Sequence, residues 1–144
     1  MAVEVDNRTA ERPDEVALAA LIDDVLDDQG ASDGEVALIL VAPGDMQALN
    51  REYRMKDEVT DVLAFPLDGR EELPLGLERQ LGDVVVCSAQ AVRQAGEAGV
   101  APLEEMRTLV VHGLLHLLGH DHEIDAGEML VRQDELRAVL PPLS

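Results

Sequence analysis

The chain has 144 residues, which fits one domain spanning residues 1–144 and is long enough to bury a hydrophobic core. Apolar residues make up 47% of it, which argues against a disordered chain, and the single cysteine, Cys87, excludes an intrachain disulfide. The net charge of −19 is opposite to the basic footprint usual in nucleic-acid-binding proteins, and the longest apolar run, Leu109–Leu118, is too short to cross a bilayer.

The N-terminal part of the chain predicts two strands and two helices. Residues 1–12 contain a short edge strand, and a helix then begins after Asp14 and ends at Gly30, because apolar residues recur there at helical spacing. Residues 35–42 are apolar on both faces, which predicts a strand buried between layers. A short helix follows, with Asp45 as its expected N-cap.

The middle of the chain predicts two more strands separated by a long loop. Residues 54–60 form a polar linker, and residues 62–65 are a short strand. Glycines and prolines punctuate residues 66–80, which indicates a loop, and residues 81–87 are a further apolar strand.

The C-terminal part predicts three helices. Ser88 is expected to cap the first, a second covers residues 102–118 and stops at Gly119, and a last one covers roughly residues 125–140. Helices on a small mixed sheet are therefore expected, in the α/β or α+β class.

All four histidines lie close together in the run V-V-H-G-L-L-H-L-L-G-H-D-H. His112 and His116 are four residues apart, so a helix places them on one face with Cβ atoms about 5–6 Å apart. The helix is expected to break at Gly119, which allows the chain to fold back and offer His122 as a third ligand. Three nitrogen ligands leave a fourth position open for water, as in catalytic zinc sites.

Ordinary core or surface histidines are the alternative interpretation. Apart from the histidines and Gly113, residues 109–118 are all aliphatic, and a helix that is apolar nearly all round is buried. Burying an unsatisfied polar group costs about 1–3 kcal/mol, and one metal ion satisfies both imidazoles. We therefore expect one zinc ion per chain on His112, His116 and His122, although imidazole also suits nickel, copper and iron.

The residue after His112 bears on which reaction the histidine site can catalyse. Metallopeptidases with the H-E-x-x-H motif have a general-base glutamate there, and this chain has Gly113. A peptidase would need its base from elsewhere, such as Glu123 or Glu128.

The histidine run resembles the signature H-G-x-L-H-L-x-G-Y-D-H of the YbeY family, bacterial rRNA maturation endoribonucleases. Two upstream blocks are similar too: L-N-R-E-Y-R-M-K-D with T-D-V-L-A-F-P, over residues 49–57 and 60–66, and L-G-D-V-V-V-C, over residues 81–87. The blocks occur in family order within about residues 35 to 135.

The resemblance implies helices flanking a four-stranded mixed sheet, with zinc on the three histidines named above. It implies cleavage of single-stranded RNA, maturation of the 3′ end of small-subunit rRNA, and a role in ribosome quality control. Arg54 matches the family's functionally important arginine, so Arg54 and His116 are the expected catalytic residues. The expected partners are single-stranded rRNA and the ribosome or small-subunit assembly proteins, with no membrane. No signal peptide is visible, which with the lone cysteine indicates the cytoplasm.

This chain departs from the family pattern at two positions. His120 stands where the family usually has tyrosine, and Ala64 where a serine is common. His120 is either a fourth ligand, a group that tunes the metal, or an exposed side chain.

Other polar residues near these motifs have a structural or a functional interpretation. Asp61 and Asp83 flank strands and are expected mainly to cap or turn them, and Asp121 either orients a ligand imidazole or lies in a turn. Lys56 is either a second phosphate contact or an exposed linker residue. Cys87 ends an apolar strand and is expected to be a small buried hydrophobe.

Two further functions stay open alongside RNA cleavage. One is metal-dependent hydrolysis of another substrate, such as a peptide. The other is a non-catalytic ribosome-assembly factor with a structural metal. RNA cleavage also requires local capture by the few cations near the site, because the chain as a whole repels a polyanion.

Overall fold

A computed structural model describes residues 3–31, 34–66 and 79–118, with the backbone alone for residues 79 and 80. This part of the chain forms eight elements in the order β1 (Val3–Asn7), α1 (Glu15–Asp28), β2 (Gly34–Val41), α2 (Pro43–Arg54), β3 (Val62–Pro66), β4 (Arg79–Cys87), α3 (Ser88–Ala98) and α4 (Pro102–Leu117). None of the described helices is long and apolar enough to cross a membrane.

The four strands form one mixed sheet in the order β1-β2-β4-β3. β1 and β2 pair in parallel, as do β2 and β4, whereas β3 pairs with β4 in the antiparallel sense. β3 is therefore an edge strand. The expected α/β (α+β) class and the four-stranded mixed sheet are both confirmed.

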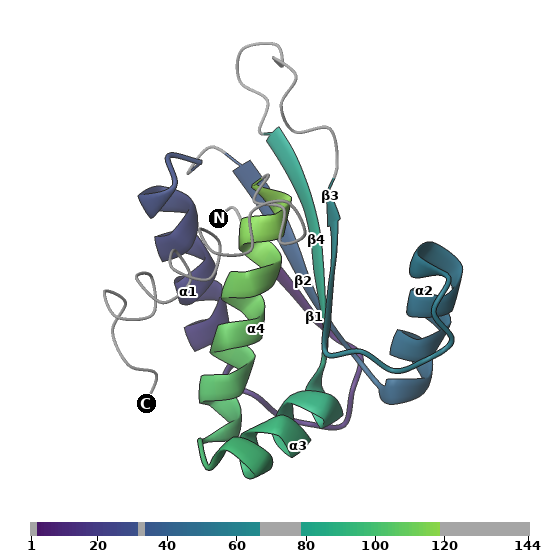
Figure 1. The fold of residues 1–144 in the computed structure, drawn as a ribbon. Coiled ribbons are helices and arrows are strands. Elements are labelled where there is room, and N and C mark those ends of the chain that lie inside the picture. The colour runs from purple at the N-terminus through teal and green to yellow at the C-terminus, as the bar shows by residue number, and fades with distance from the viewer. Residues whose placement is uncertain (1–2, 32–33, 67–78, 119–144) are drawn as a thin grey trace.

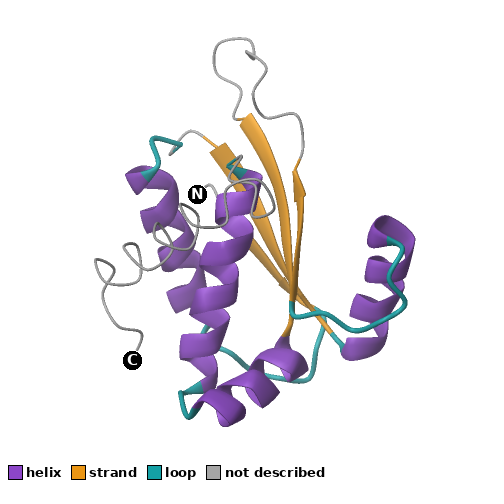
Figure 2. Cartoon of the chain, viewed as in Figure 1, coloured by secondary structure: helices purple, strands orange, loops and turns teal. Residues whose placement is uncertain are grey.

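The helices cover the two faces of the sheet unequally (Figures 1 and 2). α1 and α4 lie against one face, with α3 packed at one end of α4, and α2 lies alone on the opposite side. The larger apolar cluster fills the space between the sheet and the helices α1 and α4, and it includes Ile22, Leu38 and Leu114. A smaller cluster lies under α2 on the other face of the sheet and includes Met46 and Val85.

The elements predicted within the described residues are confirmed, with three local corrections. α2 begins at Pro43 with Ala42 as its N-cap, so Asp45 lies in the first turn and is not the cap. Ser88 is the first residue of α3 and follows the N-cap residue, so the Ser88 side chain does not cap the helix. Arg54 is the last residue of α2, not part of a linker. The expected helix over residues 125–140 lies outside the described residues.

Gly113 allows α4 to lie close to the sheet. A Cβ atom built at this position would lie 2.6 Å from Cγ1 of Val84 and 3.3 Å from Cγ2 of Val62. Both valines are on the strands beneath α4, β4 and β3. Any larger residue at position 113 would push the helix that carries the histidines away from β3.

Candidate active site

The two histidines of α4 point toward one another. Their Nε2 atoms are 3.2 Å apart, and their ring centroids are 4.8 Å apart with the ring planes at 62°. Both distances follow from helical spacing, because residues four apart lie one above the other on the same face. The apolar residues around them on α4 are almost all buried.

This separation fits two ligands of one metal ion. Zn–N bonds of about 2.0–2.1 Å at a tetrahedral angle place two ligand nitrogens about 3.3 Å apart. A hydrogen bond between the two imidazoles has a similar length, so the same geometry also fits a direct contact of the two rings in the absence of metal. His122, His120 and Asp121 lie outside the described residues. The described residues contain no group of three metal-binding side chains.

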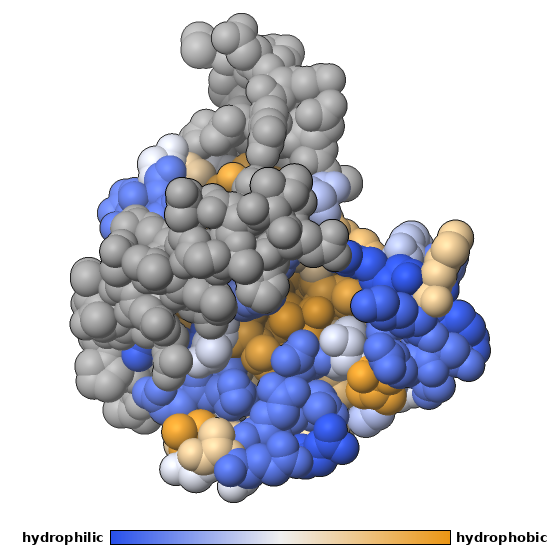
Figure 3. All heavy atoms as spheres, in the orientation of Figure 1, coloured by the Kyte–Doolittle hydropathy of each residue, from blue (hydrophilic) through white to orange (hydrophobic). Residues whose placement is uncertain are grey.

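The histidines open into a cavity of about 500 Å³ that runs past the edge strand β3 to the end of α2. Figure 3 shows apolar surface (orange) next to the mostly polar surface (blue) of α2, at the right of the view. Described residues from two stretches of the chain, 50–64 and 112–116, line the cavity: Asn50, Arg54, Lys56, Glu58, Thr60, Asp61, Val62, Leu63, Ala64, His112, Gly113 and His116. The fold therefore brings Arg54 to the same cavity as His112 and His116.

The charge of the cavity wall differs from that of the whole chain. Among the described residues of the lining, Arg54 and Lys56 contribute two positive charges and Glu58 and Asp61 two negative charges, so this part of the wall is formally neutral with neutral histidines. The chain as a whole carries −19. The described part of the wall therefore repels an anionic substrate less than the average surface of the chain does.

Asn50 fixes the segment that carries Arg54 and Lys56. Its side chain is buried, with 3% exposed, and its Nδ2 donates to the backbone carbonyl of Glu58 at 3.0 Å. The backbone carbonyl of Asn50 accepts from the backbone N–H of Lys56 at 3.3 Å. It also accepts from the backbone N–H of Met55, a residue in the left-handed conformation at φ 58°. This residue was not singled out from the sequence. The signal that would have identified it is its position in the helical pattern. Asn50 is four residues after Met46, where an apolar residue is expected.

Asp61 has a structural role in the described residues, as expected. Its Oδ1 accepts from the backbone N–H of Val62 at 2.8 Å, and its Oδ2 accepts from Nε2 of Gln94 at 3.3 Å. Its carbonyl accepts from the backbone N–H of Cys87 at 2.9 Å. These bonds hold the start of β3 against β4 and α3, and so keep one wall of the cavity in place.

Two other candidates lie away from the histidine cavity. Asp83 lies on the α2 side of the sheet, opposite Phe65 in the β3–β4 pair. Cys87 is fully buried, and this burial raises the pKa of its thiol above the ordinary value. A buried thiol with a raised pKa is a poor nucleophile, so Cys87 belongs to the core.

Gly113 also bears on the peptidase alternative. Position 113 faces the sheet, where even a Cβ atom would meet Val84. A glutamate in the place that H-E-x-x-H peptidases use would not fit between α4 and the strands. The close packing of α4 on the sheet at Gly113 therefore excludes a general-base glutamate at this position.

The sequence model of the family described as Endoribonuclease YbeY matches residues 4–140 of this chain. The chain belongs to this family. The match extends over nearly the whole sequence and includes both the Arg54 block and the histidine block, so membership supports an endoribonuclease activity for the chain.

Individual relatives agree with the family match. An endoribonuclease YbeY of Desulforamulus reducens is 42% identical, with 94% of this chain and 93% of the relative covered. That of Moorella thermoacetica is 39% identical, with 96% of each chain covered. A Thermotoga maritima protein known from its solution structure is 27% identical, with a TM-score of 0.63 over 93% of this chain and 85% of that one.

Proposed function

We propose that this chain is a metal-dependent endoribonuclease specific for single-stranded RNA. It acts in the maturation of the 3′ end of small-subunit rRNA and in ribosome quality control, in the cytoplasm. The observation that carries the proposal is the shared cavity, in which Arg54 and Lys56 lie with the paired imidazoles of His112 and His116. Family membership supports the RNA substrate.

The proposed ligands of the metal are His112, His116 and His122, with zinc as the expected ion. The 3.2 Å between the two Nε2 atoms supports the first two assignments. When bound, such an ion lowers the pKa of its water toward about 7 and polarises a phosphoryl oxygen. Because α4 is packed closely on the sheet at Gly113, the two imidazoles are held in a fixed position before the substrate arrives.

Arg54 is proposed to bind the phosphate at the cleavage site. Its guanidinium can donate two parallel hydrogen bonds to one phosphate, which fixes both position and orientation. Lys56, two residues further along the segment held by Asn50, supplies a second cation to the same cavity. Both cations offset the charge that develops on the phosphate oxygens as the bond to the leaving oxygen breaks.

The size of the cavity favours an unpaired strand. A volume of about 500 Å³ is in the range that holds one small organic ligand, such as a single nucleotide. Unpaired RNA can turn a single phosphate inward past β3.

The test compares single-stranded RNA, a duplex of the same sequence, and casein as substrates, with and without a chelator. We expect cleavage of the single strand alone, its loss with chelator, and its return when zinc is added back. Elemental analysis of the same preparation should give one ion per chain. Undiminished cleavage by protein shown to be free of metal would contradict metal dependence, and casein cleavage would favour the peptidase alternative.

A further inference from the structure

The chain's only tyrosine and only phenylalanine lie side by side. The rings of Tyr53, on α2, and Phe65, on β3, have centroids 5.1 Å apart and planes at 74°, an edge-to-face arrangement. Tyr53 remains 58% exposed, although aromatic rings are normally buried for their apolar area. Part of the tyrosine ring is thus held in place by Phe65 and still available to a ligand.

The pair borders a second cavity, of about 340 Å³, on the α2 side of the sheet. Its floor consists of aliphatic side chains from β2, β4 and α2, namely Ile39, Val41, Val85 and Leu49. Arg8 and Asp83 add polar groups to it. The described lining of the cavity is therefore largely apolar, with polar groups from Arg8, Asp83 and the hydroxyl of Tyr53.

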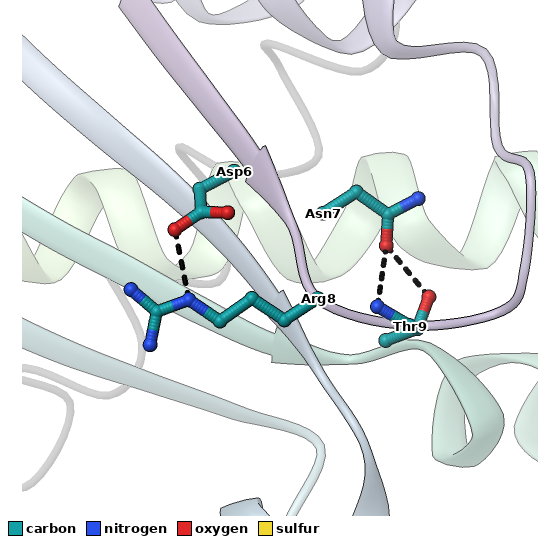
Figure 4. Close-up of polar contacts among 4 residues, drawn as sticks. All are labelled: Asp6, Asn7, Arg8 and Thr9. Atoms are coloured by element: carbon teal, nitrogen blue, oxygen red, sulfur yellow. Dashed lines mark hydrogen bonds and ion pairs between the residues drawn. The ribbon is translucent and has the colours of Figure 1, made fainter.

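Arg8 is held in place by its neighbours, as Figure 4 shows. Its Nε donates to Oδ2 of Asp6 at 2.8 Å. Oδ1 of Asn7 accepts from both the backbone N–H and the hydroxyl of Thr9, at 3.0 and 2.6 Å, which fixes the turn after β1. Arg8 thus lines this cavity with a largely exposed guanidinium that is paired with Asp6.

The second cavity and the histidine cavity are bordered by two of the same elements, α2 and β3. Tyr53 and Arg54 are consecutive residues of α2, and each lines one of the two cavities. On β3, Leu63 lines the histidine cavity and Phe65 the second one. Tyr53 is therefore one residue along α2 from the proposed phosphate-binding residue, Arg54.

We propose that Tyr53 and Phe65 form a stacking subsite for an unpaired RNA base adjacent to the phosphate bound by Arg54. The inference rests on the proposed function and names how its substrate is held. A base combines a flat apolar face with donors and acceptors at its edge, which matches an aromatic ring over an aliphatic floor with Arg8 and Asp83 beside it. Stacking also needs no positive charge, which suits RNA binding by a chain of net charge −19.

The chain provides its own reporter for this contact. Tyr53 is the only tyrosine and there is no tryptophan, so intrinsic tyrosine fluorescence reports on this one side chain. The probe is a short single-stranded RNA and a series in which each base in turn is replaced by an abasic ribose. We expect the intact RNA to change Tyr53 fluorescence, and one abasic position to abolish that change.

Variants separate stacking from apolar packing. Tyr53→Leu keeps an apolar side chain and removes the ring, and should weaken RNA binding by about 5- to 150-fold. Tyr53→Trp should restore binding, since it keeps an aromatic face. The matched control is Val16→Ser, at a residue that is 82% exposed on α1, and it should bind RNA as the wild type does.

The outcomes distinguish this inference from the proposed function. If the wild type cleaves RNA but Tyr53→Leu binds equally well and the fluorescence does not respond, the stacking subsite is refuted and the nuclease proposal stands. If RNA binds with the fluorescence change and is not cleaved, stacking stands and the nuclease proposal fails. Concentration-dependent dimerisation that Tyr53→Leu abolishes, without any effect on RNA binding, would show that this surface contacts a second copy of the chain instead.

Discussion

The proposal of a bound metal ion rests on the imidazoles of His112 and His116. Removing one of them leaves at most two of the three proposed ligands, which cannot hold the ion against water. We therefore predict that His116→Ala abolishes stoichiometric metal binding, as measured by elemental analysis, and lowers the melting temperature, because metal binding couples to folding. Full metal occupancy in this variant would contradict the three-histidine assignment.

His120 provides the control for that experiment. The family usually has tyrosine at this position, so we predict that His120→Tyr keeps the metal content and the cleavage rate of the wild type. A large loss of bound metal in His120→Tyr would instead identify His120 as a fourth ligand and favour a closed, structural site.

Arg54 tests the chemistry apart from the metal. We predict that Arg54→Ala retains metal and fold and loses RNA cleavage on the order of 10²-fold, because a charged donor to the reacting phosphate is missing. Arg54→Lys should recover little of this loss, since lysine lacks the planar fork. Cleavage rate, metal content and melting temperature are measured on the same preparations.

The matched control for Arg54 lies one turn earlier on the same helix. Arg51 is exposed, lies 3.6 Å from Asp57 in an ion pair, and does not line the histidine cavity. Arg51→Ala removes the same charge from α2 and should cleave RNA nearly as well as the wild type. Equal losses in both variants would mean that Arg54 acts only through the general charge of α2.

At the scale of the element, the close approach of α4 to the sheet depends on Gly113. Alanine here gains up to about 1 kcal/mol of helix propensity but places Cβ 2.6 Å from a branched valine, and overpacking costs about 1–3 kcal/mol. We predict that Gly113→Ala lowers the free energy of unfolding by up to about 2 kcal/mol, measured by denaturant titration, and reduces cleavage by displacing the histidines from β4 and β3.

Gly96 on α3 is the control for that prediction. A Cβ atom at this position meets nothing within 4 Å, so only the propensity gain applies. Gly96→Ala should therefore stabilise the protein by up to about 1 kcal/mol. If the two alanine variants had the same effect, the packing of α4 at Gly113 would not be tight in solution.

At the scale of the whole molecule, the charge of −19 predicts an unusual salt dependence. Two phosphate contacts, from Arg54 and Lys56, give a slope of about −1.4 for log K against log salt, at about −0.7 per contact for single strands. Repulsion by the remaining surface makes the slope shallower still. We predict a slope no steeper than this in RNA titrations at several salt concentrations.

Lys56 tests whether two phosphate contacts account for the salt dependence of RNA binding. Lys56→Ala should bring the slope closer to zero by about 0.7 if its ammonium contacts a phosphate. An unchanged slope would make Lys56 an exposed residue with no role in binding. A much steeper slope in the wild type would require further cations outside the histidine cavity.

The sequence by itself determined most of the secondary structure of the described residues and the spacing of His112 and His116. Apolar periodicity and end signals such as Asp14 act over a few neighbouring residues, so β1, α1 and α4 begin and end close to their predicted positions. The 3.2 Å approach of the imidazoles follows in the same way, because helical spacing is local.

Only the tertiary structure decided which distant residues meet. Arg54 reaches the histidine cavity because α2 and α4 lie on opposite sides of the edge strand β3, and Tyr53 meets Phe65 because α2 packs beside that strand. Nothing in the residue pattern indicated that Gly113 faces two valines, because that contact depends on how α4 packs across the sheet. Such contacts come from the packing of whole elements, and residue patterns along the chain report only which face of each element is apolar.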